Sequence, residues 1–428
     1  MLTTADDGST IEPGLADVPA VSEDATTYTF TLQDGVTFQD GSPMTADDVV
    51  FSLDEARSDT GASAEDFASI SAVAAVDDAT VEITLAEPDN ELTYNLTRRG
   101  GAVVQADATD LESSANGTGP FRLTDWSVGS SITLERFDDY WGDPASVAEV
   151  TFLYFTEPNA AVNALTTGDA DILTGVNTDL VGPLEDDPAF VVNEGTTNGE
   201  VTLGFNNSKA PLDDQAVRMA IRQAIDKQGV LDLYNGYGTL IGGPVPPTDP
   251  WYEDLNDVAP YDADAARAAL EGAGVAEGTP LTLVYPNIYP TNLAEYIASQ
   301  LGDVGLEVEI QVVEFSVWLE QVYTNADYDL TVVIHVEPHD LANYANPDYY
   351  WRYDSPEVQD LIADARTAPS PEESTELLRE ATRIISEDAA ADWLLLFADL
   401  TVARQGVSGY PLNDTASRFD ASAITVTD

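Results

Sequence analysis

The only two histidines of the chain stand close to two carboxylates in one short segment, VIHVEPHD. Imidazole and carboxylate side chains at such spacing can bind a metal ion or contact a polar ligand. Pro338 separates the histidines, so we do not expect them to share one helix face. The segment follows Asp329–Val333, predicted to be a buried strand, and ligands of α/β sheets bind beyond the carboxyl ends of strands. Ligand contact is therefore favoured over loop packing, and loop packing over a metal site. The four residues are His335, Glu337, His339 and Asp340.

Other catalytic chemistry finds little support in the local sequence. The chain has no cysteine, which excludes disulfides, thiolate metal sites and cysteine nucleophiles. It also has no phosphate-binding G-x-x-x-x-G-K-[ST] motif and no G-x-S-x-G turn. Asp47 and Asp48 follow Thr45, a good N-cap residue, and favour the start of a helix over a metal site.

The charge balance is extreme, with 77 acidic against 16 basic residues and a net charge of −61. A disordered acidic chain would lack aromatic residues, whereas this one has 6 Trp and 18 Tyr. We therefore predict a folded protein with an acidic surface, tolerable where salt screens charge, as in proteins of salt-loving organisms. Nucleic acid is disfavoured as a partner because its phosphates would be repelled.

The start of the chain, MLTTADDGST, has neither the basic nor the apolar region of a secretory signal. No apolar run reaches the roughly 18 residues of a membrane-spanning helix. These observations leave a cytoplasmic protein, or a chain that begins after its targeting segment, as the two interpretations.

The elements that must position these side chains follow an α/β pattern. Two strand-like runs, Phe121–Trp126 and Ser131–Phe137, predict a β-hairpin. Pro211–Val230 has the apolar stripe of one amphipathic helix, and the Gly- and Pro-rich stretch Gly236–Pro250 indicates a linker. Strand, helix, strand, helix and strand then alternate from 281 to 333, which predicts a compact α/β domain that ends at the histidine segment.

Several blocks in this order resemble one family, the large substrate-binding proteins of ABC importers for peptides, oligopeptides or nickel, known as solute-binding protein family 5. The acidic composition makes the resemblance haloarchaeal-like. The blocks are YTFTLQDGVTFQDGSPMTADDVVFSLD (28–54), GTGPFRLTDWSVGSSITLERFDDYWG (117–142), EPNAAVNALTTGDADI (157–172), LGFNNSKAPLDDQAVRMAIRQAIDKQGV (203–230) and a weaker fifth that includes ANPDYYWRYDSPEVQDLI (345–362).

The resemblance implies an α/β, bilobal periplasmic-binding-protein-like fold of class II, cluster C, with two hinge crossings. Lobe I would hold residues 1–245 and 396–428, and lobe II residues 250–395. The Gly/Pro stretch and the run Trp393–Val402 would be the two crossings. The family's N-terminal signal, anchor and first strand would be missing, so the chain would be N-terminally shortened.

The implied protein is extracellular, cell-surface associated and monomeric. It would capture a small solute, expected to be a peptide, and pass it to ABC permease subunits, with no catalytic activity, no cofactor and no nucleic acid. The implied ligand-binding residues are Trp126, Trp141, Asn206, His335, Glu337, His339, Asp340 and Tyr344, with Tyr140 as a further aromatic candidate.

One departure from the family's pattern concerns the ends of a peptide ligand. Peptide binders of the family have a basic residue near the helix expected at Thr291–Leu301, and none occurs there. An acid for the peptide amine is expected at Asp340 or Glu337. The alternatives are a binder of a metal chelate such as nickel, a nonfunctional truncated fragment and, less favoured, a peptide hydrolase.

Overall fold

A computed structural model describes residues 1–5, 8–61, 63–106, 108, 115–415 and 418–427. The chain divides into two compact units. Unit 1 contains residues 1–195, 366–371 and 399–428, and unit 2 contains 196–365 and 372–398. Among the described helices, none is long and apolar enough to cross a bilayer.

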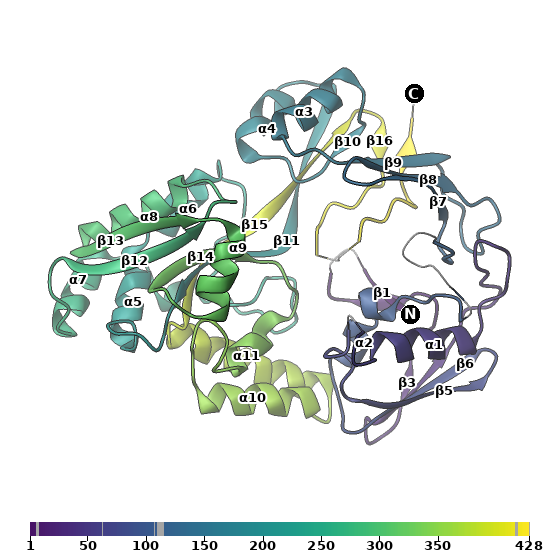
Figure 1. The fold of residues 1–428 in the computed structure, drawn as a ribbon, viewed down its shortest axis with the longest axis horizontal. Helices are drawn as coiled ribbons and strands as arrows, with labels where there is room; N and C mark the ends of the chain where they lie inside the picture. Colours follow the sequence, from purple (N-terminus) through teal and green to yellow (C-terminus); the bar gives the residue numbers. More distant parts are fainter. Residues whose placement is uncertain (6–7, 62, 107, 109–114, 416–417, 428) are drawn as a thin grey trace. The chain divides into compact units, whose positions relative to one another are not determined.

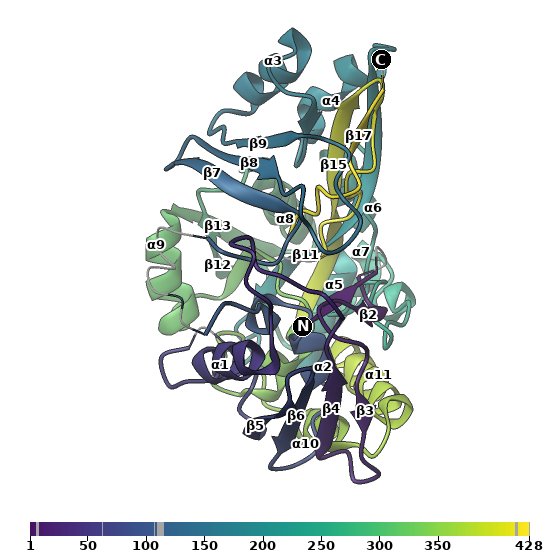
Figure 2. The same ribbon diagram turned by 90° about the vertical axis from the view of Figure 1, so that its right-hand side faces the viewer.

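Unit 1 contains small antiparallel sheets and short helices (Figures 1 and 2). A four-stranded sheet has the order β3-β4-β6-β5, a three-stranded sheet the order β7-β8-β9, and β1–β2 and β16–β17 are pairs. The elements are β1 Leu2–Thr4, β2 Ile11–Pro13, β3 Ala20–Val21, β4 Thr27–Thr31, α1 Ala46–Ala56, β5 Ile70–Asp77, β6 Thr80–Leu85, α2 Leu92–Asn95, η1 Arg99–Gly101, β7 Phe121–Ser127, β8 Ser131–Arg136, β9 Glu149–Leu153, α3 Pro158–Thr167, β10 Ile172–Leu173, α4 Thr178–Glu185, β16 Val407–Ser408 and β17 Thr425–Val426.

Two sequence predictions in unit 1 are confirmed. Strands β7 and β8 form the predicted hairpin, with Gly129 at a φ of 73° in the turn. Asp48 belongs to the start of α1, where its carboxylate accepts hydrogen bonds from the backbone N–H groups of Thr45 (2.8 Å) and Ala106 (2.9 Å). Its two oxygens therefore stabilise the helix start and the neighbouring loop.

The connection between the last two helices of unit 2 belongs to unit 1. Arg366 pairs with the buried carboxylate of Asp89 at 2.9 Å, and Ser69 donates a hydrogen bond to the same carboxylate. The N–H of Asn90 donates to the backbone carbonyl of Arg366. A charged, hydrogen-bonded group thus fixes this short segment in unit 1.

Unit 2 is built on a mixed sheet. The full sheet has the order β10-β15-β11-β14-β12-β13, and its two longest strands, β11 and β15, supply residues to both units. The remaining elements are β11 Phe190–Phe205, α5 Gln215–Ala224, α6 Lys227–Leu233, η2 Asn256–Val258, α7 Ala263–Gly272, β12 Thr279–Pro286, α8 Asn292–Asp303, β13 Leu306–Val313, α9 Phe315–Trp318, the π-helical turn η3 Leu319–Thr324, β14 Leu330–His335, η4 Asp340–Ala345, α10 Pro356–Thr367, α11 Pro371–Glu387 and β15 Ala391–Arg404.

Helices cover both faces of the unit 2 sheet (Figure 1). Leu283 and Tyr285 of β12 point into the apolar core formed with α5 to α8, whereas Val284 between them points into the core formed with α9 to α11. This alternation follows from the two-residue period of a strand. A sheet buried on both faces explains why these strands read as nearly continuous apolar runs.

The single helix predicted over Pro211–Val230 is wrong. The structure has two helices, α5 and α6, separated by Ile225, whose backbone is extended (φ −96°, ψ 116°). The reason is a local cap: the Asp226 carboxylate accepts a hydrogen bond from the N–H of Gln228 at 3.0 Å and starts α6. The apolar stripe continues through the break, so periodicity alone did not reveal it.

The Gly/Pro stretch Gly236–Pro250 does not connect the two compact units, because it lies wholly within unit 2. The chain passes between the units inside β11, at Gly195, on either side of the segment Arg366–Pro371, and inside β15, at Ala398. Residues 196–245 pack in unit 2 because β11 pairs with β14 and α5 packs on the same core. The predicted lobe boundaries, 1–245 with 396–428 and 250–395, remain a proposal about which parts move together.

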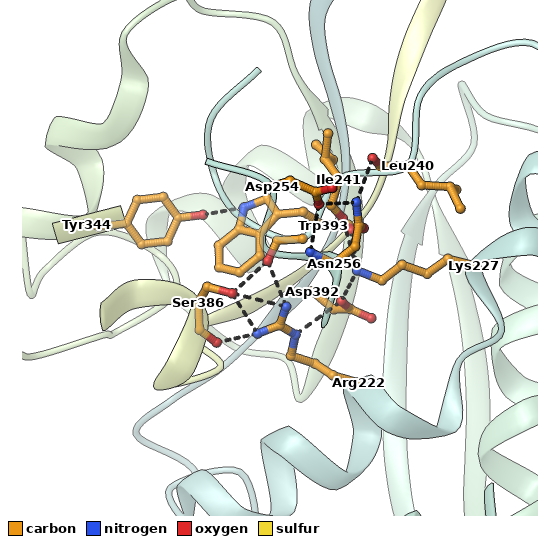
Figure 3. Close-up of polar contacts among 11 residues, drawn as sticks. Arg222, Lys227, Leu240, Ile241, Asp254, Asn256, Tyr344, Ser386, Asp392 and Trp393 are labelled. Carbon is orange, nitrogen blue, oxygen red and sulfur yellow. Dashed lines mark hydrogen bonds and ion pairs between the residues drawn. The ribbon is translucent and has the colours of Figure 1, made fainter. Parts of the chain in front are cut away.

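A buried ionic cluster holds the start of β15 in unit 2 (Figure 3). Asp392 is fully buried, and one of its oxygens, Oδ1, lies 3.3 Å from Nε of Arg222 and 2.9 Å from Nζ of Lys227. Arg222 also donates to the carbonyls of Gly242 and Ser386, and Lys227 to those of Ile241 and Trp393. Helices α5, α6 and α11 and the Gly/Pro stretch are thereby tied to one strand.

Gly242 is required by this arrangement. A Cβ at position 242 would lie 2.2 Å from the backbone carbon of Leu255 and 2.4 Å from the nitrogen of Asn256. Only a residue without a side chain allows the two backbone segments to approach this closely. The Gly/Pro stretch is therefore a tightly packed part of unit 2.

We predict that Asp392→Ala will lower the free energy of unfolding by about 3 to 5 kcal/mol, because it leaves two buried cations without their carboxylate. Urea unfolding at fixed salt, followed by tryptophan fluorescence, measures the change. Asp264→Ala is the matched control, since it removes an exposed carboxylate from a surface pair with Arg267. Equal stability of the two variants would contradict the role given to Asp392.

Candidate ligand-binding site

The candidate site lies where β14 ends in unit 2. The last residue of β14, His335, is paired in register with Glu200 of β11, so both side chains lie on one face of the sheet. The chain then turns through His339, which has left-handed backbone geometry (φ 56°), into the short helix η4 that begins at Asp340. Strand pairing and this turn bring together residues from distant parts of the sequence.

His335 is a largely buried, neutral support, with 12% of its side chain exposed. Its Nε2 forms a 2.7 Å hydrogen bond with the hydroxyl of Tyr350, and its Nδ1 lies 3.5 Å from Oδ2 of Asp340. Its ring also packs against Trp351, with centroids 4.9 Å apart. Burial lowers the pKa of His335 to about 4, because the imidazolium form would lose its hydration. The ring therefore orients Asp340 and Tyr350 and carries no charge near neutral pH.

Carboxyl groups converge around this histidine. Burial, followed by the charges of the neighbouring Asp249 and Glu337, raises the pKa of Asp340 to about 7. Burial also raises the pKa of Glu200 well above its ordinary value, and Asp340 and Asp249 add to the shift. Like charges in a poorly hydrated place favour the neutral, protonated forms of the carboxyl groups. The raised pKa values therefore indicate that the cluster is short of positive charge.

His339 faces the same acids from the turn. Its Nε2 lies 4.0 Å from Oδ1 of Asp249, and its ring packs edge-on against Trp251 with centroids 4.6 Å apart. The indole N–H of Trp251 is buried and has no hydrogen-bond partner among the described residues. The cluster thus contains a polar hydrogen that the folded chain leaves unused.

An aromatic wall adjoins the acids. Tyr344 stacks on Trp351 (centroids 4.2 Å apart, planes 19° apart), and its hydroxyl accepts a hydrogen bond from Nε1 of Trp393 at 3.1 Å. Half-buried Tyr349 packs against Tyr350 and Trp351, and burial together with the charge of Asp340 raises the Tyr349 pKa. Carboxylates beside π faces form a setting that suits a cationic group.

The other sequence candidates have separate surroundings. Asn206 is buried, and its side-chain amide donates to the carbonyls of Ala326 and Tyr328 while its oxygen accepts from Ser208. Trp141, in unit 1, packs on the apolar core of that unit and donates its indole N–H to the carbonyl of Thr118. Trp126, also in unit 1, is 51% exposed on β7. Asn206 and Trp141 thus have structural bonds, whereas Trp126 is accessible.

Sequence reasoning missed Glu200 and Asp249. Glu200 precedes the apolar run VTLGF and looked like a residue before the strand, whereas β11 extends through it. Asp249 lies in the Gly/Pro stretch, which looked like a linker. The only local signal for Glu200 was a carboxylate at the edge of an apolar run. Its place in the site depends on the pairing of β11 with β14, which is a long-range contact that local sequence does not reveal.

Within the described residues, no group of three or more His, Cys, Asp or Glu side chains is arranged to hold a metal ion. His335 uses one ring nitrogen on Tyr350 and has the other beside Asp340. The arrangement can instead accept hydrogen bonds from a cation and pack against its apolar parts.

The sheet, its helical layers and the site at the end of β14 define a two-unit α/β solute-binding fold. Residues 10–360 match the family model described as bacterial extracellular solute-binding proteins, family 5, middle, and the chain belongs to this family. The dipeptide-binding protein of Escherichia coli (strain K12) is 28% identical over 453 aligned positions, which cover 93% of this chain and 83% of that protein.

Solved structures share the fold. DppA from Helicobacter pylori in complex with the peptide STSA has a TM-score of 0.80 and 24% identity, covering 99% of this chain and 91% of that one. NikA from Brucella suis in complex with Fe(III)-EDTA has a TM-score of 0.86 and 19% identity, covering 100% of this chain and 93% of that one. The predicted α/β periplasmic-binding-protein fold is thereby confirmed.

We predict that Asp340→Asn will change the free energy of unfolding in a pH-dependent way: relative to the unmodified protein, the variant will be more stable at pH 8 than it is at pH 5. The pKa of Asp340 rises from 3.8 to about 7 on folding, so the folded state retains a proton that the unfolded state has lost between these values. Stability from this group is therefore lost as pH rises toward 7, and the neutral amide avoids the loss.

The measurement is urea unfolding of both proteins at pH 5 and pH 8. The comparison is made between variants because His335, whose pKa falls on folding, has the opposite pH dependence below about pH 6.5. Asp264→Asn, with a side chain 98% exposed, serves as control. A stability difference for Asp340→Asn that does not change with pH would show that the carboxyl is already ionised.

Proposed function

We propose that this protein captures a peptide with a free amino terminus and delivers it to an ABC import permease, with no catalytic step. The observation that carries the proposal is the group of carboxyls beside an aromatic wall at the end of β14, of which Glu200 is buried and Asp340 is partly buried. Support comes from the family and from relatives whose names specify dipeptides or peptides. In keeping with them, we place the protein outside the cell and expect it to act as a monomer without nucleic acid.

Each residue receives a role from its contacts. Asp340 and Glu337 accept hydrogen bonds from the ligand ammonium, and His339 adjusts the charge of the same cluster. His335, Tyr344 and Asn206 position the site through their bonds within unit 2.

Trp126 and Trp141 are assigned to unit 1. Trp126 is a contact candidate because its ring is accessible, and Trp141 supports the backbone at Thr118. An aromatic side chain offers a large apolar surface to the apolar parts of a solute.

The positive charge that these carboxyl groups lack would come from the ammonium group of the ligand. Beside Asp340 and Glu200 it would favour the ionised carboxylates and lower their pKa values, so capture would release protons. Affinity should consequently fall as pH drops from about 8 to about 5, where the pKa of Asp340, about 7, keeps that carboxyl protonated in the unliganded protein.

The test is native mass spectrometry of the protein with a pool of di- and tripeptides and with the same pool N-acetylated. We expect complexes with the free peptides only, and a loss of affinity of roughly tenfold to a hundredfold in Asp340→Asn, as for a charged hydrogen bond. Asp264→Asn should bind like the unmodified protein.

Equal binding of both pools would remove the role of the amine. Binding of nickel–histidine, with no peptide bound, would favour the metal-chelate alternative, since a relative of the same fold was solved with Ni(L-His). Cleavage of the pooled peptides would show that the proposed non-catalytic role is incomplete.

We further propose that the surface is adapted to high salt. A net charge of −61 repels itself, and the screening length shortens from about 10 Å at 0.1 M salt to about 3 Å at 1 M. The melting temperature should therefore rise steeply between about 0.1 M and 1 M NaCl. NaCl is used in place of a sulfate salt, because sulfate is excluded from protein surfaces and stabilises proteins by that separate effect. A melting temperature unchanged by NaCl would contradict the proposal.

A further inference from the structure

Two tyrosines of unit 2 differ from the other tyrosines around the candidate site. Tyr323 is 47% exposed and Tyr349 is half-buried, whereas Tyr328, Tyr344 and Tyr350 are buried. The hydroxyls of the three buried tyrosines are all engaged in hydrogen bonds. Within the described part of the chain, no hydrogen bond engages the hydroxyl of Tyr323 or of Tyr349. We call these two residues the tyrosine pair.

An unusual helical turn sets the position of Tyr323. Residues Leu319–Thr324 form the π-helical turn η3, and the N–H of Asn325 donates to the carbonyl of Glu320, five residues earlier, at 3.1 Å. The neighbouring Val322 is fully buried, so the turn is anchored in the core while Tyr323 stays accessible. Turns of this kind are rare and are frequently found at functional sites.

Tyr349 connects Tyr323 with the acidic cluster. The two rings meet edge-on, with centroids 5.6 Å apart and planes 83° apart. Burial and then the charge of Asp340 raise the pKa of Tyr349, and Glu337 adds to the shift. An accessible ring face and two carboxyl groups are therefore neighbours of the same tyrosine.

The arginine nearest in sequence to Tyr349 is engaged elsewhere. Arg352 donates to the carbonyl of Asp348 at 2.8 Å and pairs with the carboxylate of the same residue at 3.4 Å. The groups that lower the pKa of Asp340 are Asn343 and His339, and neither is a lysine or an arginine. A strong cation beside the tyrosine pair would therefore come from a ligand.

The chemistry of the pair favours a guanidinium group. A planar guanidinium stacks on aromatic rings and is more weakly hydrated than an ammonium. Its N–H donors can at the same time reach a carboxylate or a tyrosine hydroxyl. An apolar side chain would cover the rings, but it would use neither the hydroxyls nor the negative charge beside them.

We propose that the tyrosine pair receives the guanidinium group of an arginine at the first position of the bound peptide. The inference rests on the proposed function, in which the ammonium of the peptide lies at Asp340 and Glu337. The side chain of the same ligand residue extends past Tyr349 to the open face of Tyr323. The preferred solutes are thus peptides that begin with arginine and carry two positive charges near the amino terminus.

The test compares three dipeptides, Arg-Ala, citrulline-Ala and Ala-Ala, by isothermal titration calorimetry at pH 8 and one NaCl concentration. Citrulline has nearly the shape of arginine without its charge. Arg-Ala should bind roughly tenfold more tightly than citrulline-Ala, as expected for a cation against a partly desolvated aromatic ring.

Variants of Tyr323 show whether the ring is responsible for the preference. Tyr323→Leu keeps an apolar side chain and should reduce the preference for Arg-Ala over citrulline-Ala to about threefold or less, whereas Tyr323→Phe keeps the ring face and should retain most of it. Tyr154→Leu is the matched control, because it replaces a similarly accessible tyrosine (53% exposed) in unit 1. Circular dichroism checks that each variant folds.

Proton NMR of bound Arg-Ala gives a second measurement on the unmodified protein. The Cδ protons of the ligand arginine should move upfield on binding, because they lie over a tyrosine ring. The upfield shift should be lost with Tyr323→Leu and retained with Tyr154→Leu.

The outcomes separate this inference from the proposed function. Binding of Ala-Ala, with equal affinities for Arg-Ala and citrulline-Ala, would overturn the inference and leave the proposed function intact. A preference for Arg-Ala that is unchanged in Tyr323→Leu would overturn the role of the tyrosine pair. If none of the three dipeptides binds, the inference and the proposed function are both wrong.

Discussion

The arrangement of unit 2 depends on one buried carboxylate. Asp392 balances Arg222 and Lys227 in a place from which water is excluded, and it fixes the point at which β15 enters the sheet. The next residue, Trp393, continues the same constraint toward the site: its carbonyl accepts from Lys227, and its indole N–H donates to Tyr344. Tyr344 then stacks on Trp351 beside His335. The aromatic wall is therefore held by the interaction that orders the fold.

The cluster around Asp392 and the cluster around Asp340 differ in how their charges are balanced. In the first, two cations flank one carboxylate and donate their other hydrogen bonds to backbone carbonyls. In the second, burial and the charges of other acids shift the pKa of Asp340 most. The adjacent imidazole of His335 is neutral. A folded chain that maintains such an imbalance loses stability at that place, which is a common property of binding sites. A cationic ligand would restore the balance that the chain itself leaves incomplete.

Local sequence predicted the parts of the fold that local interactions determine. The β7–β8 hairpin and the start of α1 follow from turn residues and from the Asp48 carboxylate at the helix terminus. The end of β14 was predicted to be a ligand site because ligands of α/β sheets bind beyond the carboxyl ends of strands, and it remains a candidate. Sequence reasoning failed where a distant partner decides the outcome. Glu200 becomes part of the site only because β11 pairs with β14. Gly236–Pro250 looked like a linker because glycine and proline are common in linkers, yet Gly242 is there to allow close backbone packing.

The division of the chain between the units has a consequence for its synthesis on the ribosome. Every residue of unit 2 lies between positions 196 and 398, whereas unit 1 also needs Arg366–Pro371 and the segment from Asp399 onward. Translation proceeds from the N-terminus, and domains generally fold as units once their residues have emerged. Unit 2 can therefore fold while the last part of unit 1 is still unmade. The first 195 residues must wait, incompletely packed, for the C-terminal segment, which makes the nascent N-terminal half the part most in need of protection by chaperones.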